Sequence, residues 1–479
     1  MAALALVTLI LGGAYDARWR LPDLKPWHRI SMDDLDGAAL NEGFTFAQYL
    51  AHEDQMFARL RAFEATIEPA ERTPVNRYHA GSLSHPSSAG HDWNRSFETV
   101  PEHIRGGALL VHGLTDSPYS MRSVAEVLRE HGVYSLALRM PGHGTVPSAL
   151  VTATWRDWLA AVRMGVRHVR SKTPAGAPLV LVGYSNGGAL ALTYTLGAIE
   201  GNGDAVPSKL LLLSPMIGVT PAAGLAWWIS LLGAVPYFEK SNWLDVLPEY
   251  NPFKYNSFPA NAGFQTASLT RALRDEMARV AASGHLDAIP PILTFQSAVD
   301  ATVSTPAVVH DLYDRLPANG SELVLFDVNH VSGIDVFLQP SDRSLLERLL
   351  ERTPRRYRRV IVTNGSPDSR DVEARMIEPG VVTVTLQPLG MSWPPEVFSL
   401  THIAIPFAPN DPLYGIDGSS RIAGLLPIGR LSPRGERAVL TVGTDTLMRL
   451  SSNPFFPYIA ERVVQWLGPL PAEQSSRRH

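Results

Sequence analysis

The chain has 479 residues and a formal net charge of −4, and 45% of its residues are hydrophobic. This composition is ordinary for a globular protein of one to three domains. The charges are spread along the chain, so the sequence does not indicate the basic face that nucleic-acid binding requires. The chain contains no cysteine, which excludes disulfides, thiolate nucleophiles and cysteine-based metal sites.

The chain begins with MAALALVTLILGG, a stretch of thirteen residues without a charge. It is shorter than the ~20 apolar residues of a membrane-spanning helix and lacks the basic start of a secretory signal. We expect residues 1–20 to have a membrane or export role, with Arg18 and Arg20 at the interface. A buried strand or helix is the alternative, in which case the protein is cytoplasmic.

Residues 21–105 form a predicted N-terminal extension. It contains one predicted helix, FTFAQYLAHEDQMFARLRAFEATI, in which aromatic residues and leucines recur at helical spacing. The simplest interpretation is a helix that packs on the body of the protein.

From residue 106, strand-like and helix-like segments alternate. Strands are predicted at GALLVHG, VYSLALRMPGHG, LVLVG and KLLLLSP, and the helices between them are SPYSMRSVAEVLREHG, TWRDWLAAVRMGVRHVRS and GGALALTYTLGAIE. Several of these strands are apolar on both faces, as in a parallel sheet covered by helices. The predicted fold class is therefore α/β, with a mostly parallel, doubly wound sheet whose two halves span residues 106–216 and 289–340.

Residues 217–288 interrupt this alternation and are predicted to form a helical cap. Its apolar side chains lie close together in the sequence: Trp227, Trp228, Leu231, Leu232, Tyr237 and Phe238. Residues 341–479 form a predicted C-terminal extension that ends in a closing helix, NPFFPYIAERVVQWL. Its strand-like stretches are RRVIVTN, VVTVTLQPL, VFSLTHIAIPF and RAVLTV.

The segment PLVLVGYSNGGALAL places Ser185 between an apolar strand and a helix. Residues 183–187 fit the pattern G-x-S-x-G, in which the serine occupies a strained turn and small flanking residues let strand and helix approach closely. An ordinary serine in a turn would fit the pentapeptide alone, but the strand before it and the helix after it favour a nucleophile. Ser185 is therefore the predicted nucleophile.

A serine nucleophile creates an oxyanion, which needs hydrogen-bond donors. One predicted donor is the backbone N–H of Asn186, and the other is the N–H of Leu114 in the loop LLVHGLTDSP. We interpret His112 in that loop as a structural residue, and His143 in PGHG as a loop residue that bonds to the backbone.

The acid of such a site follows the serine in the chain and precedes the histidine. Asp300 lies in the loop after the strand PILTFQS and is the predicted acid. Asp327, in LFDVN, is the weaker competitor. Asp157, in TWRDWL, precedes the serine and is interpreted as a residue on a helix face.

In this order, VHGLTDSP, RMPGHG, GYSNGG and SAVDATV resemble the α/β-hydrolase superfamily, near its lysophospholipase, monoacylglycerol lipase and carboxylesterase branch. The resemblance covers about residues 95–340. It implies an α/β-hydrolase fold with a Ser–Asp–His triad and an oxyanion hole in the HG loop, roles that fall on Ser185, Asp300, Leu114 and Asn186. The long C-terminal part departs from the usual pattern, so the histidine stays open.

Two histidines compete as the base. His330 ends ELVLFDVNH thirty residues after Asp300, which is the usual spacing, but further strands follow it instead of the closing helix. His402 lies in SLTHIAIPFAPNDPLYG, before the closing helix, and this stretch resembles a bacterial subgroup of hydrolases with such an extension. We prefer His402, which makes residues 341–400 an insertion between acid and base, and keep His330 as the alternative.

These residues predict a serine hydrolase that cleaves carboxylic esters through an acyl-enzyme. The apolar cap favours a hydrophobic acyl or alkyl group, and hence a small hydrophobic or lipid-like substrate. The alternatives are an amide or peptide hydrolase and a non-catalytic, membrane-associated scaffold on the same fold. The sequence contains no motif for a metal, a cofactor or a phosphate-binding loop, and none of these ligands is expected.

Overall fold

A computed structural model of the chain describes residues 12–218, 233, 235–333, 337, 353–419, 422, 424–432 and 439–470. The apolar first eleven residues lie outside the described residues. So do four of the apolar cap residues named above, namely Trp227, Trp228, Leu231 and Leu232.

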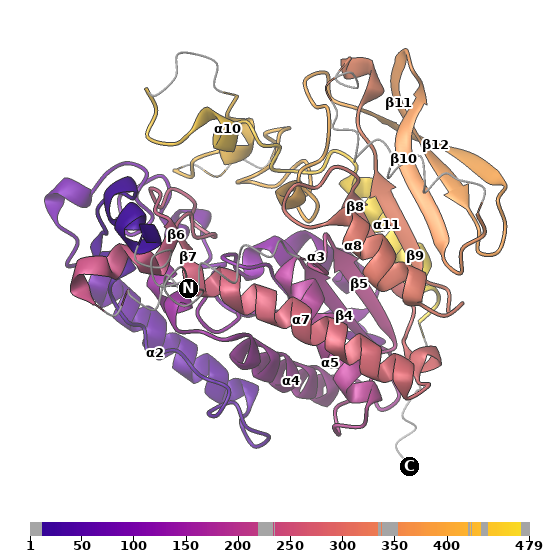
Figure 1. Cartoon of the computed structure of the whole chain (residues 1–479), viewed down its shortest axis with the longest axis horizontal. Helices are drawn as coiled ribbons and strands as arrows, with labels where there is room; N and C mark the ends of the chain where they lie inside the picture. The colour runs from indigo at the N-terminus through magenta and orange to yellow at the C-terminus, as the bar shows by residue number, and fades with distance from the viewer. Residues whose placement is uncertain are drawn as a thin grey trace, which may run out of the picture.

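Within the described residues, ten strands form one sheet in the order β1-β3-β2-β4-β5-β8-β9-β10-β11-β12 (Figure 1). The seven strands from β3 to β10 in this order pair in parallel, while β1, β11 and β12 are antiparallel to their neighbours. The predicted α/β class with a mostly parallel sheet is therefore confirmed. The strands are β1 (Phe97–Thr99), β2 (Gly106–Val111), β3 (Val133–Leu138), β4 (Leu179–Tyr184), β5 (Lys209–Leu213), β8 (Ile292–Ser297), β9 (Glu322–Phe326), β10 (Arg358–Ser366), β11 (Ser369–Ile377) and β12 (Val384–Ser392).

Helices cover both faces of this sheet, because its central strands are apolar on both sides. Every residue of β2, β3 and β4 is buried. One face packs against α4 (Trp155–Lys172), α5 (Asn186–Ile199) and α7 (Ala260–Ala282). The other face packs against α3 (Arg122–Glu130) and the closing helix α11 (Phe456–Leu467). The sheet is thus doubly wound, as its strand pattern predicted.

The predicted cap contains a helix that belongs to the core. α7 begins at Ala260, and its buried side chains join those of α4 and α5 over the sheet. The described remainder of the predicted cap includes a two-stranded antiparallel ribbon of β6 (Trp243–Asp245) and β7 (Phe258–Pro259).

The predicted C-terminal extension continues the core sheet. β10 pairs in parallel with β9, and β11 and β12 follow it antiparallel at the edge. The prediction of a strand at VFSLTHIAIPF is wrong. Its Phe398 carbonyl accepts the N–H of Asn329, and His402–Ala404 is a short 3-10 helix, so the segment bonds to loops instead of joining the sheet.

The N-terminal extension packs on the core through α2 (Phe46–Glu64), as predicted. Thr45 caps this helix and Gln48 completes the capping box. Phe46, Tyr49 and Phe57 of this helix are buried, and the Tyr49 hydroxyl donates to the Arg139 carbonyl at 2.6 Å. Residues 12–20 are also helical. None of the described helices combines the length and the apolar character needed to cross a membrane.

A buried ion cluster joins this extension to the loop after β3. The Arg139 side chain is 0% exposed and donates to both oxygens of Asp34, at 2.7 and 3.0 Å, and to Glu53 at 3.2 Å. Asp34 also accepts the N–H of Gly142, at 2.6 Å. Burial alone would raise the pKa of Asp34, but the neighbouring Arg139 charge holds it below its usual value. The extension thereby holds the PGHG loop in place.

A buried neutral histidine makes the fold sensitive to acid. His28 accepts the Lys25 N–H on Nδ1 at 2.9 Å and lies 3.0 Å from the Ser257 hydroxyl through Nε2. Burial lowers its pKa to about 3, whereas an unfolded histidine binds a proton near its ordinary pKa of about 6.5. The unfolded chain therefore binds more protons between these two values, and stability falls as the pH falls through this range.

We expect His28→Gln to reduce the loss of unfolding free energy between pH 8 and pH 5 by about 2 kcal/mol. Urea denaturation at the two pH values measures this difference. His131→Gln is the control, because His131 is exposed. An unchanged pH dependence in His28→Gln would contradict a neutral His28 in the folded state.

Candidate active site

Ser185 lies at a sharp turn between β4 and α5. Its φ is 53° and its ψ is −116°, a conformation that residues with a side chain rarely adopt. Its N–H donates to the Leu213 carbonyl at 2.9 Å, and its carbonyl accepts the N–H groups of Gly188 and Met216 at 2.9 and 3.0 Å. These three bonds hold the strained turn in place.

The glycines on either side of Ser185 are required by close packing. A Cβ on Gly187 would lie 2.1 Å from the Val111 carbonyl oxygen, and one on Gly183 would lie 2.5 Å from the Gly187 carbonyl oxygen. Real Cβ atoms essentially never approach so closely. The geometry is that of a nucleophile elbow, in which small residues bring strand and helix together.

Asp300 and His402, 102 positions apart, form a buried pair. His402 Nδ1 lies 2.9 Å from Asp300 Oδ2, and the two side chains are 5% and 0% exposed. The N–H groups of Thr302 and Val303 donate to the other oxygen of Asp300, at 2.8 and 3.0 Å. Because an ionised carboxylate only accepts, Nδ1 carries the hydrogen, and Nε2 is the nitrogen that can accept a proton.

The charge of Asp300 is stabilised within this pair. Burial alone would raise the pKa of Asp300, but the hydrogen bond from His402 and the electrostatic attraction between the two side chains hold it below its usual value. The His402 ring also stacks on Tyr184, the residue before Ser185, with centroids 5.3 Å apart. Ser297 at the end of β8 donates to the Leu400 carbonyl at 2.8 Å. The segment that carries His402 is thereby joined both to β8, the strand before Asp300, and to the elbow.

The second candidate base has a different partner. His330 Nε2 lies 3.0 Å from Asp327 Oδ2, which also accepts the Thr363 hydroxyl at 2.8 Å. The structure therefore pairs His402 with Asp300 and His330 with Asp327. Of the two histidines, only His402 is hydrogen bonded to the predicted acid.

The two predicted oxyanion donors lie beside the elbow. A Cβ on Gly113 would lie 3.3 Å from Ser185 Cβ, so the HG loop contacts the serine directly. Asn186 is the first residue of α5, where backbone N–H groups lack a partner within the helix. In the part of the chain that the structure describes, no group accepts a hydrogen bond from the N–H of Leu114 or of Asn186.

The two histidines of the HG and PGHG loops, His112 and His143, both bond to the backbone. The Met140 N–H donates to His112 Nε2 at 3.1 Å, so Nδ1 carries the hydrogen that is donated to the Gly113 carbonyl at 2.8 Å. His143 Nδ1 lies 3.0 Å from the Pro141 carbonyl oxygen. Burial lowers the pKa of both histidines, that of His143 to about 4, so both stay neutral at pH 7. Bonding of His143 to the backbone is thus confirmed.

Asp157 has a local structural role at the start of α4. It lies at the third position of this helix and accepts the N–H of the capping residue Thr154 at 2.7 Å. It also accepts the N–H of Gly37, at 2.7 Å, and so ties the N-terminal extension to the core.

Residues of the C-terminal part pack against the segment that follows the HG loop, a contact that no sequence motif indicated. The hydroxyl of Tyr119, just after the HG loop, donates to Asp411 at 2.8 Å, and its ring stacks on Phe253 at 4.1 Å. Asn251 Nδ2 donates to the Tyr414 hydroxyl at 2.7 Å. The apolar residues around these contacts form a separate buried cluster. The abundance of aromatic residues in these segments was the only sequence signal.

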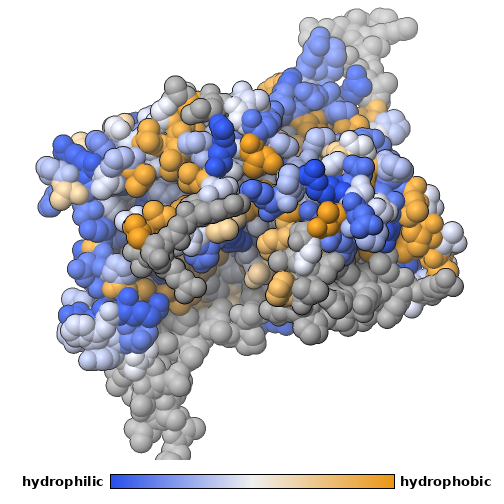
Figure 2. Space-filling model, turned by 90° about the horizontal axis from the view of Figure 1, so that it is seen from above, coloured by the Kyte–Doolittle hydropathy of each residue, from blue (hydrophilic) through white to orange (hydrophobic). Residues whose placement is uncertain are grey.

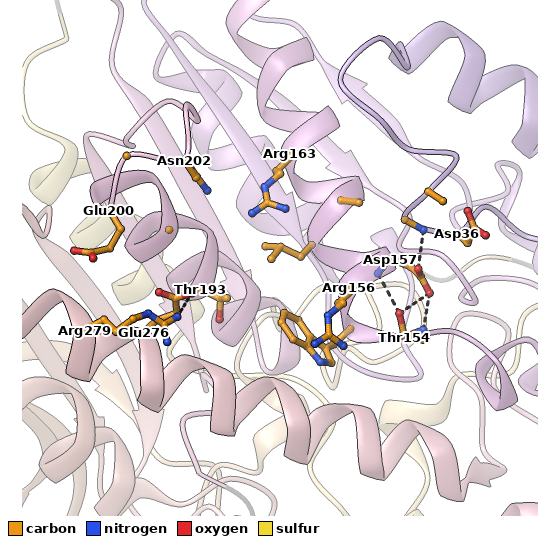
Figure 3. Close-up of a pocket in the computed structure, with 17 residues that line it drawn as sticks. Asp36, Thr154, Arg156, Asp157, Arg163, Thr193, Glu200, Asn202, Glu276 and Arg279 are labelled. Carbon is orange, nitrogen blue, oxygen red and sulfur yellow. Dashed lines mark hydrogen bonds and ion pairs between the residues drawn. The ribbon is translucent and has the colours of Figure 1, made fainter.

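A separate hollow of about 900 Å³ lies between α4, α5 and α7 (Figure 3). None of its lining residues comes from the HG loop, the elbow, or the loops of Asp300 and His402. Its Arg279 pairs with Glu276 at 2.5 Å, and its Arg163 pairs with Asp204 at 2.8 Å. Ser185 and its neighbours therefore remain the candidate active site. Among the residues described, no three His, Asp or Glu side chains gather as metal ligands would.

Residues 102–329 match a protein family described as "Serine aminopeptidase, S33". Over 250 residues the chain is 28% identical to the thermostable monoacylglycerol lipase of Bacillus sp. (strain H-257), covering 51% of this chain and 89% of that enzyme. A structure of the metagenome-derived lipolytic enzymes LipS and LipT matches 54% of this chain and 96% of its own, at 22% identity and a TM-score of 0.38. A soluble variant of monoglyceride lipase from Saccharomyces cerevisiae matches 48% of this chain and 81% of its own, at 17% identity and a TM-score of 0.35.

These findings confirm the resemblance that the four motifs indicated: the chain carries an α/β-hydrolase domain. It is a hydrolase similar to a monoacylglycerol lipase, and ester hydrolysis is supported at the level of the family. The matched family segment ends at residue 329, before both candidate bases, so the choice between them depends on the geometry described above.

Proposed function

We propose that this protein is a serine hydrolase of carboxylic esters that carry an apolar acyl or alkyl group. The observation that carries the proposal is the buried Asp300–His402 pair, stacked on the residue before the strained Ser185. Similarity to a monoacylglycerol lipase supports a lipid-like ester as the substrate.

In this mechanism, the base is His402 and the nucleophile is Ser185. Nε2 of His402 takes the hydroxyl proton as Oγ attacks the ester carbonyl carbon, and Asp300 stabilises the imidazolium that forms. The N–H groups of Leu114 and Asn186 stabilise the oxyanion. The alcohol leaves with the proton from His402. A water molecule activated by the same histidine then hydrolyses the acyl-enzyme and releases the acid.

The surroundings of the elbow support an apolar group on the substrate. Met216, whose N–H binds the Ser185 carbonyl, and the adjacent Ile217 are both buried. The rings of Phe253 and Tyr119 stack on each other next to the HG loop. Apolar side chains beside the elbow favour an apolar group on the substrate, since each buried CH₂ contributes about 0.8 kcal/mol.

Labelling with a fluorophosphonate probe tests the nucleophile. We expect the wild type to be labelled and to hydrolyse p-nitrophenyl butyrate and p-nitrophenyl octanoate. The Ser185→Ala variant should not be labelled, and its kcat/KM for these esters should fall by about 10⁴-fold or more. Ser214→Ala is the matched control, because Ser214 is a buried serine that also has a positive φ, of 43°. Circular dichroism checks that each variant is folded.

An aminoacyl p-nitroanilide is the comparison substrate, because the matching family is described as an aminopeptidase. Hydrolysis of the anilide without hydrolysis of either ester would overturn the ester assignment in favour of an amide hydrolase. A folded wild type that is neither labelled nor active on any of these substrates would favour the scaffold hypothesis.

A further inference from the structure

Two basic residues that the mechanism does not use, Lys254 and Arg449, lie in separate segments that border the candidate active site. Lys254 lies in the loop between β6 and β7, and Arg449 follows α10 (Thr444–Leu447). In the described ranges, neither side chain forms an ion pair with a carboxylate. Neither positive charge is therefore neutralised by direct contact with a carboxylate.

Lys254 is fixed beside the oxyanion loop. The N–H of the next residue, Tyr255, donates to the Thr115 carbonyl at 2.7 Å, one residue after Leu114. The Tyr255 hydroxyl accepts the Thr145 N–H at 2.8 Å, and the ring of the preceding Phe253 stacks on Tyr119. With both neighbours anchored, the partly exposed Lys254 is held at the oxyanion side of the site.

Arg449 is fixed at the opposite side, beside the acid and the base. Its Nη2 lies 3.4 Å from the hydroxyl of Thr302, whose N–H donates to Asp300 at 2.8 Å. The carbonyl of the next residue, Leu450, accepts the hydroxyl of Thr401 at 2.5 Å, directly before His402. The exposed guanidinium therefore lies at the rim of the site, over the acid loop.

The two positive charges are close enough to repel each other. Burial lowers the pKa of Lys254, the carboxyl of Asp116 opposes this shift, and the charge of Arg449 adds to it. The carboxyl of Asp116 offsets part of this repulsion, although burial raises its pKa to about 6. An anion between Lys254 and Arg449 would relieve their repulsion and satisfy both.

We propose that Lys254 and Arg449 bind an anionic group, a carboxylate or a phosphate, on the alcohol part of the ester. The alcohol is the group that receives a proton from His402, and Arg449 is joined to the segment of that histidine. A guanidinium suits either anion, because it binds both in a bidentate manner. The substrate is then an amphiphile with an apolar acyl chain and a charged alcohol.

The outer surface is consistent with such a substrate. On the face seen from above in Figure 2, hydrophobic and hydrophilic patches alternate among the coloured residues. The segment around α10 lies along this upper side of the molecule in Figure 1. This proposal rests on the proposed ester hydrolysis, and its test separates the two.

Three octanoate esters with the same acyl chain test the subsite: those of glycerol, of glyceric acid and of glycerol 3-phosphate. We expect a higher kcat/KM for one or both charged esters than for the glycerol ester, by about tenfold or more, and a smaller difference at high salt. A preference for the glyceric acid ester indicates a carboxylate, and one for the phosphate ester indicates a phosphate.

Lys254→Gln and Arg449→Gln are each expected to lower the ratio of charged to neutral kcat/KM by about tenfold, while Lys254→Arg retains it. Arg271→Gln is the matched control, because Arg271 is an exposed arginine on α7. Equal kcat/KM for the three esters in the wild type would overturn the proposal. So would an unchanged ratio in both glutamine variants.

Binding of octyl phosphate to Ser185→Ala, measured by calorimetry, requires no turnover. Binding that weakens about tenfold in the Lys254→Gln background supports the subsite even if no ester is hydrolysed, in which case only the proposed function fails. Ester hydrolysis without any preference for charged esters and without octyl phosphate binding overturns the subsite alone.

Discussion

Replacing His402 with alanine is expected to lower kcat/KM for p-nitrophenyl octanoate by about 10⁴-fold or more, to the level of Ser185→Ala. The reason is the hydrogen bond of 2.9 Å between His402 and Asp300, which leaves Nε2 to accept the serine proton. Asp300→Asn should cause a loss of similar order, because an amide in place of the carboxylate favours the wrong histidine tautomer. Steady-state kinetics of the purified variants measure these losses.

His330→Ala is the matched control for this prediction. His330 also pairs with an aspartate, but its partner is Asp327, and we expect the variant to retain most of the wild-type activity. The opposite pattern, in which His330→Ala is inactive and His402→Ala is active, would make His330 the base. The C-terminal part would then be an accessory to an earlier-closing hydrolase core.

The second large effect concerns stability. Arg139→Met is expected to lower the free energy of unfolding by about 3–5 kcal/mol, because it leaves the carboxylates of Asp34 and Glu53 without their buried cation. Urea denaturation at pH 7 measures this change. Adding Asp34→Asn and Glu53→Gln to Arg139→Met should restore part of the loss, since the uncompensated charges are then removed.

The exposed pair of Arg59 and Asp33, at 2.5 Å, is the control for this cluster. Arg59→Met should leave the denaturation midpoint unchanged within error, because solvent screens an exposed pair. If Arg139→Met were as stable as Arg59→Met, the buried cluster would not hold the N-terminal extension on the core.

Local patterns were sufficient to predict the central fold. The apolar strands β2 to β5 and the helices between them follow from hydrophobic periodicity, and the elbow at Ser185 follows from the spacing of its glycines. β11 was missed because SRDVEARMI is rich in charged residues, and its pairing with β10 on one side and β12 on the other makes it a strand. VFSLTHIAIPF has the apolar content of a strand, but its hydrogen bonds go to neighbouring loops.

The site was predictable to the extent that its residues lie in motifs. Ser185, Asp300, Leu114 and Asn186 each follow a recognisable strand end, whereas the partner of Asp300 depended on how three later strands extend the sheet. The preference for His402 came from the resemblance of its segment and from the closing helix after it, because no local pattern pairs two residues that are 102 positions apart. Lys254 and Arg449 were missed for the same reason: tertiary contacts alone bring them to the site.

The position of His402 has a consequence for the order in which a working site is made during synthesis. Ser185 and Asp300 emerge from the ribosome well before β10, β11 and β12, whereas His402 emerges only after all three strands. A nascent chain thus exposes a complete elbow and acid loop while the hydrogen bond between Asp300 and His402 cannot yet exist. If His402 is the base, the chain stays catalytically silent until the last strands of its sheet have been translated.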